Sequence, residues 1–157
     1  MTAIAVQGTG FRHVRKTIAF DGGANNGNLG DNVPVFTITG RVDVEEITGY
    51  LTEALACSAG ASTFVRIGVA SNTAIFDLEA SADSGLIDTW LSDSGFLAGA
   101  TTGLARRHPI SENIILPVID DGGGADITNG TIVVDCWYKP ITDDGALAGD
   151  DIDTELV

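Results

Sequence analysis

Between Val35 and Glu79, apolar and polar residues alternate over long runs, and this alternation constrains the fold more than any other feature of the chain. A period of two places apolar side chains on one face of an extended strand. Glycine, serine, threonine and asparagine interrupt the runs, as they do at turns between strands. The pattern therefore predicts a chain built from β-strands.

The phase of the alternation predicts where each strand lies. A first strand is expected at 11–20 and a second at 33–44, where apolar residues occupy even positions. Over 47–55 they occupy odd positions, and a change of phase requires an extra residue, so we expect a bulge or tight turn within 45–49. Further strands are predicted at 65–69, 74–78, 113–119 and 131–139, with turns at 59–62, 71–72 and 129–130.

The connections complete the predicted architecture. Residues 21–32 form a long loop that we expect to be mobile, and 120–124 form a second loop, because both are rich in residues that tolerate positive φ. Only 44–56 and 83–92 could instead be amphipathic helices, and both contain poor helix formers. The sequence thus predicts an all-β chain, an antiparallel β-sandwich or jelly-roll-like single domain.

Charge and composition divide this domain from its ends. We expect an N-terminal arm at 1–10, the β-sandwich domain at 11–141 and an acidic C-terminal tail at 142–157. The net charge of −14 would repel a phosphate backbone, which argues against nucleic acid as a partner. The N-terminus lacks the pattern of a secretion signal, and no stretch approaches the roughly 20 apolar residues of a membrane span. We expect a soluble protein, synthesised in a cytoplasm, with no membrane partner.

Few residues are suited to catalysis. The histidines, His13 and His108, lie beside arginines and lysines, so we expect both to be exposed polar residues and neither to be a general base. The cysteines, Cys57 and Cys136, are expected to be buried free thiols because two cysteines make no disulfide framework. We predict that the protein is not an enzyme and has no catalytic site.

Paired carboxylates are abundant but lie in glycine-rich or terminal segments. Asp120, Asp121 and Asp126 are conceivable calcium ligands, although the spacing of an EF-hand is missing. Asp120 or Asp121 could instead serve a hydrolase, although a glycosidase pair is held on rigid strands. Solvated surface acid is the interpretation we prefer, with no metal site and no cofactor.

The N-terminal strand carries concentrated positive charge. Arg12, Arg15 and Lys16 lie within five positions, and the first 20 residues contain no acid. Residues 141–157, in contrast, carry six acids and no base. In a chain this acidic, the three cations would steer that end toward negative surfaces, so we predict that they contact a protein partner.

Four segments resemble small β-rich structural proteins of tailed bacteriophages. They are Phe36-Thr37-Ile38-Thr39-Gly40-Arg41-Val42, Leu51-Thr52-Glu53-Ala54-Leu55, Ile67-Gly68-Val69-Ala70-Ser71-Asn72-Thr73-Ala74, and Gly130-Thr131-Ile132 with Asp135-Cys136-Trp137-Tyr138-Lys139-Pro140-Ile141. The similarity covers about residues 30–141 and rests on strand and turn patterns.

The resemblance implies a virion protein located on the capsid surface. The implied role is that of a capsid decoration or cement protein, which binds the major capsid protein and itself as a homo-oligomer such as a trimer. From their charge, and not from the resemblance, we predict that Arg12, Arg15 and Lys16 form its capsid contact. One alternative is a receptor- or carbohydrate-binding module that uses Trp90, Trp137 and Tyr138 as stacking platforms; another is a tail or head-to-tail structural subunit.

Overall fold

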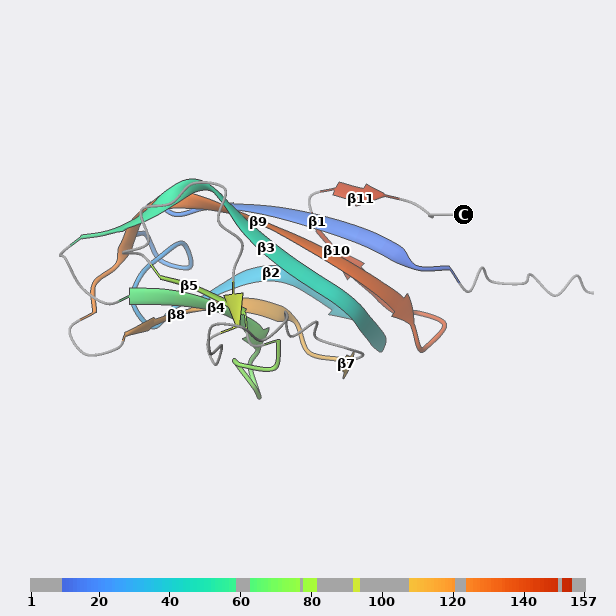
Figure 1. Cartoon of the computed structure of the whole chain (residues 1–157). Coiled ribbons are helices and arrows are strands. Elements are labelled where there is room, and N and C mark those ends of the chain that lie inside the picture. Colours follow the sequence, from blue (N-terminus) through green and yellow to red (C-terminus); the bar gives the residue numbers. More distant parts are fainter. Residues whose placement is uncertain are drawn as a thin grey trace, which may run out of the picture.

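The computed structural model describes residues 10–58, 63–76, 78–81, 92–93, 108–120, 124–149 and 151–153. Their strands form two antiparallel sheets that face each other across one core, as Figure 1 shows. The all-β antiparallel sandwich is therefore confirmed, whereas the jelly-roll connectivity stays a prediction. The described residues contain no helix that is long and apolar enough to cross a membrane.

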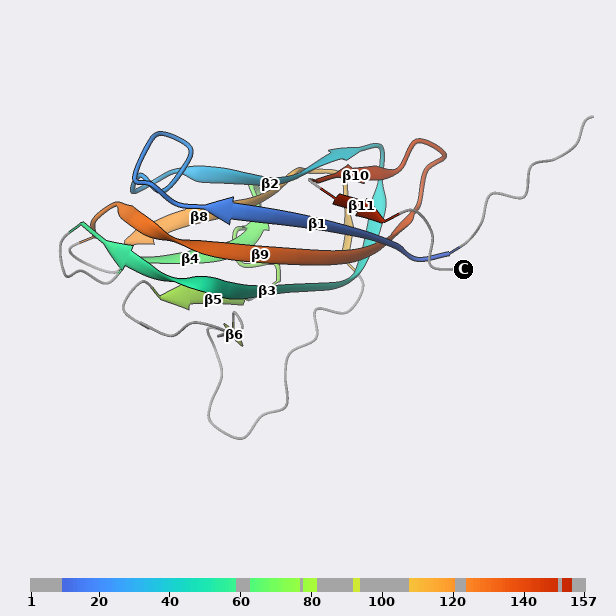
Figure 2. The ribbon, with the colours of Figure 1, turned by 90° about the horizontal axis from the view of Figure 1, so that it is seen from above.

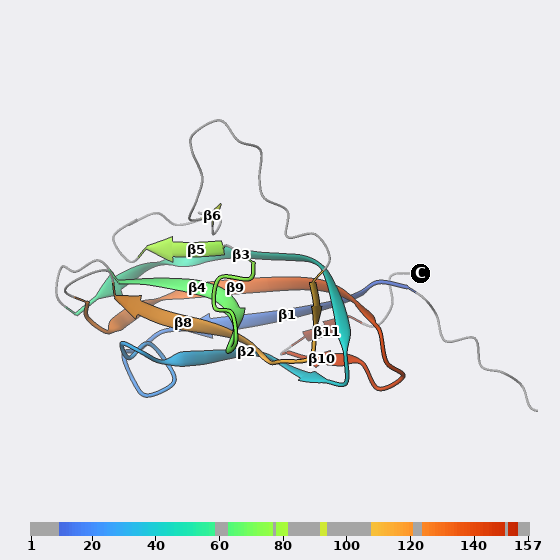
Figure 3. The ribbon, with the colours of Figure 1, turned by 90° about the horizontal axis from the view of Figure 1, so that it is seen from below.

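The first sheet has the order β11 (Asp151–Asp153), β1 (Arg12–Ala19), β9 (Ile127–Pro140), β3 (Val42–Cys57) and β7 (His108–Ile110). Strands β11, β1, β9 and β3 run along the upper side of Figure 1 and face the viewer in Figure 2, whereas β7 lies lower in Figure 1. The second sheet faces the viewer in Figure 3. Its order is β10 (Ala146–Ala148), β2 (Asn32–Thr39), β8 (Ile114–Asp120), β4 (Thr63–Val69), β5 (Leu78–Ser81) and β6 (Ser92–Asp93).

Strand β9 shows how the alternation of the sequence builds the core. Tyr138 is 2% exposed, and Ile132, Val134 and Cys136 on the same strand face are fully buried. The opposite face carries Val133, Asp135 and Trp137, as the sequence predicts. Apolar residues of the second sheet complete the core from the other side, among them Phe36, Val65, Ile67, Ile114 and Leu116.

The segment from 33 to 57 confirms one prediction and corrects two. The predicted strand at 33–44 is in fact two strands, because Gly40, at φ +64°, turns the chain from the second sheet into the first. Strand β3 then runs for 16 residues, so the alternative helix at 44–56 is wrong. The predicted bulge is confirmed, because the register of β3 against β9 shifts between Val44 and Glu46.

Asn129-Gly130 does not form the predicted turn but lies inside β9. Gly130 has φ +120°, and a Cβ there would approach Leu55 Cδ2 to 2.7 Å and the Ala54 carbonyl oxygen to 2.9 Å. The register of β3 against β9 shifts around this point. The glycine therefore permits a close approach of two strands, a requirement that the local sequence does not distinguish from a turn.

Of four further predictions for turns, a strand and a possible helix, one is confirmed, one is wrong, and two lie mostly or wholly outside the described residues. The turn at 71–72 is confirmed by reciprocal backbone hydrogen bonds between Val69 and Asn72. The strand expected at 74–78 is wrong, since 73–76 form turns and β5 begins at Leu78. The turn predicted at 59–62 and nearly all of 83–92 lie outside the described residues.

The loop at 21–32 is confirmed, and it is attached to both sheets. The Gly27 carbonyl accepts a hydrogen bond from the backbone of Ile127 at 2.8 Å, and the Gly30 N–H donates to the Val118 carbonyl at 3.0 Å. The mobility of this loop stays a prediction. Of the second predicted loop, residues 121–123 lie outside the described part of the chain.

Candidate interaction surface

The outer face of the first sheet holds the most extensively connected set of polar and aromatic side chains among the described residues. The register places Arg15 of β1 and Thr48 of β3 on either side of Asp135 of β9. In the neighbouring row, His13 and Glu46 flank Trp137. Directly opposite residues on one sheet face are close enough for their side chains to interact.

Asp135 is the centre of this face. Its side chain points away from the core, yet the residue is only 4% exposed. The Arg15 guanidinium donates two hydrogen bonds to its carboxylate, from Nε at 2.8 Å and from Nη2 at 3.0 Å. A paired fork of this kind is the strong geometry for an arginine and a carboxylate. The charge of Asp135 is thus buried with a partner of opposite sign.

His13 completes the group around Asp135. Its Nε2 lies 2.6 Å from Asp135 Oδ1, and its ring centroid lies 4.7 Å from that of Trp137. The side chain of His13 is only 16% exposed, so the prediction of an exposed polar residue is wrong. The two partners are 122 positions apart, and nothing in the local sequence around either residue could have revealed the contact.

A second group extends the same face toward the start of β1. Lys139 Nζ lies 3.9 Å from the ring centroid of Phe11, which is a cation–π contact, and 3.2 Å from Glu45 Oε1. Together the two groups join side chains of β1, β9 and β3. We call this set the cross-strand layer; it consists of Phe11, His13, Arg15, Glu45, Asp135, Trp137 and Lys139.

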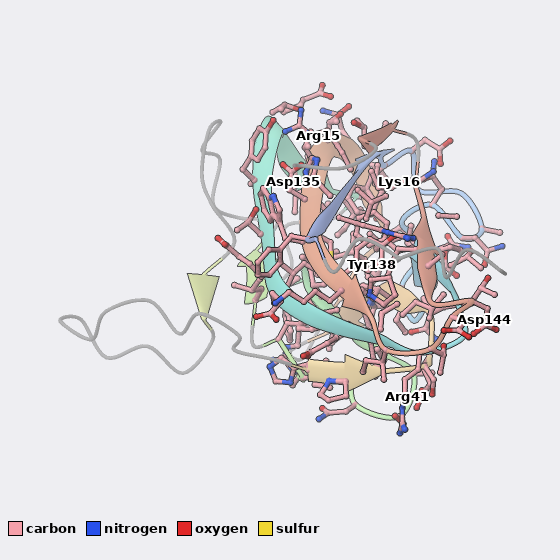
Figure 4. The ribbon with its side chains drawn as sticks, turned by 90° about the vertical axis from the view of Figure 1, so that its right-hand side faces the viewer. Arg15, Lys16, Arg41, Asp135, Tyr138 and Asp144 are labelled. Carbon is pink, nitrogen blue, oxygen red and sulfur yellow. The ribbon has the colours of Figure 1, made fainter. Side chains whose placement is uncertain are left out.

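The three cations predicted as a partner contact do not form one patch. Because successive residues of a strand point to opposite faces, Arg15 lies on the outer face while Arg12 and Lys16 share the face of the buried Val14 and Ile18. Figure 4 shows Arg15 beside Asp135 and Lys16 apart from them. Arg12 is exposed and Lys16 is half-buried.

The core beneath the layer contains a thiol with an altered acidity. Cys136 and Cys57 are both free, as predicted, but only Cys136 is fully buried. Burial raises the pKa of the Cys136 thiol far above its ordinary value, and the negative charge of Asp135 raises the same pKa further. The thiol is therefore kept protonated and unreactive.

The other candidate residues are distributed over the molecule. His108 is half-buried on β7 with its ring edge-on to Phe76 at 5.4 Å, so the expectation that it is exposed is wrong as well. Asp126 accepts a hydrogen bond from the backbone of Leu29 at 2.9 Å. Asp121 and the side chain of Asp120 lie outside the described residues. Within the described ranges, no three His, Cys, Asp or Glu residues come together in a way that could hold a metal ion.

The stacking platform of the carbohydrate alternative is incomplete. Tyr138 is 2% exposed, and its hydroxyl accepts a hydrogen bond from the backbone of Leu147 at 3.2 Å. It therefore ties β9 to β10 through the core and offers no ring to a ligand, as its inward position in Figure 4 illustrates. Trp90 lies outside the described residues, and Trp137 is already stacked on His13.

Comparison with protein-family models, with curated proteins and with solved structures gives no match for this chain.

Proposed function

We propose that this protein is a non-enzymatic structural component of a tailed-phage virion, where it binds the major capsid protein on the outer surface of the head as a decoration or cement protein. The resemblance of its strand and turn segments to phage structural proteins supports this role. A homo-oligomer would multiply weak contacts into stable attachment.

The observation that carries the proposal is the cross-strand layer. Its side chains already contact one another across three strands, through the Arg15–Asp135 pair, the His13–Trp137 stack and the Lys139–Phe11 contact. A surface ordered in advance loses little side-chain entropy on binding. Tryptophan, phenylalanine and arginine are also enriched at protein interfaces. This face is therefore suited to adhesion to another protein.

The three cations that the sequence predicts as a partner contact, Arg12, Arg15 and Lys16, have two different roles in this proposal. Arg15 supports the layer through Asp135, whereas Arg12 and Lys16 supply positive charge on the opposite face of β1. Charges outside the buried part of a contact act mainly on the association rate and on its dependence on salt.

The test uses heads from a phage that lacks the gene, incubated with purified protein and imaged. We expect regular added density over the capsid lattice, and its absence when no protein is added. Replacing both Arg12 and Lys16 by Gln should raise the concentration for half occupancy by roughly tenfold at low salt. The matched control is Arg41→Gln, which removes one exposed cation from the turn between β2 and β3.

Two results would reject the head role. Density confined to the tail or to the head-to-tail junction would assign the protein to those structures. Binding to a glycan panel or to host cells with bare, undecorated heads would favour a receptor-binding module. An unchanged half-occupancy concentration for the Arg12→Gln, Lys16→Gln variant would remove these residues from the contact.

A further inference from the structure

The structure brings the two segments of opposite charge together. Strand β1 lies in the basic segment, and β11 lies in the acidic one. They pair antiparallel at the edge of the first sheet, with Arg15 opposite Asp151, Val14 opposite Ile152 and His13 opposite Asp153. The acidic segment is thus the strand neighbour of the basic one, on the opposite side of β1 from β9 (Figure 2).

This pairing is short compared with the one on the other side of β1. Strand β9 pairs with all eight residues of β1, whereas β11 pairs with three. An edge strand of three residues contributes little stability of its own and opens easily. The pairing of β11 is consequently the weakest attachment of β1 to the first sheet.

Gly149 fixes the point from which β11 departs. A Cβ on Gly149 would approach Val14 Cγ2 to 2.6 Å and the Arg15 carbonyl oxygen to 2.7 Å. The chain is therefore held tightly against β1 as far as Gly149. Strand β11 begins two residues after this anchor, at Asp151, so its reach from β1 is short.

We infer that the edge of β1 is an acceptor site for an acidic extended strand, and that Asp151–Asp153 of a second copy of this chain occupy it in place of the chain's own β11. Within one copy, the edge of β1 already pairs with β11 as an antiparallel strand. Exchange of an identical strand between copies replaces one set of contacts by the same set, at low cost. The short reach requires the two β1 edges to lie side by side.

The hydrogen-bond pattern of the sheet identifies which backbone groups hold β11. The Phe20 N–H donates to the Gly130 carbonyl at 2.8 Å, so Phe20 faces β9. Alternation along an antiparallel strand then turns the backbone groups of His13 and Arg15 toward β11. His13 is opposite Asp153 and Arg15 is opposite Asp151. The backbone N–H and C=O groups of these two aspartates therefore face β1, while the backbone N–H of Ile152 points away from it.

This alternation provides a matched pair of proline variants. Asp153→Pro removes a backbone donor aimed at β1, whereas Ile152→Pro removes one that points away from it. Each variant introduces one proline, and the two prolines are at neighbouring positions. Asp153→Pro also removes a charge, so Asp153→Asn, which keeps the backbone donor, is measured beside it, and a loss beyond that of Asp153→Asn reports strand pairing.

The experiment measures self-association of the purified full chain by sedimentation velocity from about 1 µM to 1 mM, the range of weak to moderate affinities. We expect a dimer whose dissociation constant rises at least tenfold in Asp153→Pro and in a chain ending at Gly149, with Ile152→Pro close to the parent. The dimer should also weaken as salt rises. The truncated chain should form a mixed dimer with the full chain, which still donates its strand.

Three results would overturn the inference: a full chain that is monomeric throughout this range, a truncated chain that associates as tightly as the parent, or equal effects of the two prolines. Circular dichroism establishes that each variant is folded. If the truncated chain fails to fold, the full chain with Asp150, Asp151 and Asp153 replaced by Asn takes its place, with the same tenfold loss expected. The measurement needs no phage particle, so its outcome is independent of the proposed virion role.

Discussion

At the scale of single residues, the outer face of the first sheet contains a buried charge, the carboxylate of Asp135, which depends on the guanidinium of Arg15. It is 4% exposed, whereas the side chain of its partner Arg15 is 44% exposed. Removing the arginine would leave a buried carboxylate without its paired guanidinium, although His13 still contacts it. Removing the carboxylate would leave an arginine that water can still reach. The pair is therefore more sensitive to changes at Arg15 than a surface ion pair would be.

Arg15→Ala should lower the free energy of unfolding by about 1–3 kcal/mol, because it removes the guanidinium paired with the buried Asp135 carboxylate. Urea unfolding measures the change. Arg41→Ala is the matched control, since it removes an exposed arginine, and should cost less than about 0.5 kcal/mol. On an Asp135→Asn background the cost of Arg15→Ala should shrink. Equal costs on both backgrounds would contradict the proposed coupling.

Glu112 is the residue whose contacts predict a dependence of stability on pH. The Ser71 hydroxyl donates to Glu112 Oε1 at 2.6 Å, and the Ser71 N–H donates to Oε2 at 3.0 Å. The hydroxyl contact and then the backbone contact lower the pKa of Glu112 below its ordinary value of 4.5. These bonds stabilise the folded chain above that ordinary value. The contribution is lost as the pH falls through the lower pKa of the folded state.

Glu112→Gln should therefore lower the melting temperature at pH 7, and the difference from the parent should vanish once the pH lies below both pKa values. Thermal unfolding over a pH series measures it. Ser71→Ala removes the hydroxyl but keeps the backbone donor, and should give a smaller difference with the same pH trend. A difference that persists unchanged in acid would show that the carboxylate charge is not responsible.

At the scale of elements, the long pairing of β3 with β9 depends on local departures from a regular ladder. The register between them shifts between Val44 and Glu46 and again around Gly130. Bulges of this kind increase the twist of a strand and allow it to curve over a core. Gly130 is the position at which this curvature leaves no room for a side chain.

Gly130→Ala should destabilise the protein more than the same change at Gly30. Both glycines have positive φ, of +120° and +85°, so both substitutions strain the backbone. A Cβ at Gly30 meets nothing within 4 Å, whereas one at Gly130 meets Leu55 and Ala54. The additional crowding should cost about 1–3 kcal/mol beyond Gly30→Ala in urea unfolding. Equal losses would show that strain alone, without crowding, governs this position.

At the scale of the whole molecule, the two thiols report on different levels of opening. Cys136 lies in the fully buried core and the burial of its thiol raises its pKa, whereas Cys57 is half-buried near the end of β3. A thiol reagent attacks the thiolate, so it can modify Cys136 only after the sandwich opens. The two sites therefore separate local accessibility from global unfolding.

With a thiol reagent, Cys57 should react in the native protein, and Cys136 should react at least roughly a thousandfold more slowly, given a typical stability of about 5–15 kcal/mol. The variant Cys57→Ala isolates the slow reaction for measurement by absorbance. Its rate should rise with urea in parallel with global unfolding. Comparable rates at both sites in the absence of urea would mean that the core opens without global unfolding.

Local sequence determined much of the strand architecture of this protein. Alternating apolar residues placed β1, β4, β8 and β9, and the change of apolar phase located the bulge in β3, because burial on one sheet face demands a period of two. Composition likewise indicated two free thiols and opposite charge at the two ends of the chain.

The tertiary structure alone decided what these elements meet. The local sequence predicts a strand through Gly40 and a turn at Gly130, yet Gly40 turns the chain between the sheets and Gly130 lets two strands approach within one sheet. The contact of His13 with Asp135 joins residues 122 positions apart, whereas the separation of Arg15 from Arg12 and Lys16 follows from the alternation along β1 itself. Contacts such as that of His13 with Asp135 depend on pairing between distant strands, and the free energy of that pairing belongs to the packed sheets rather than to any segment of the sequence.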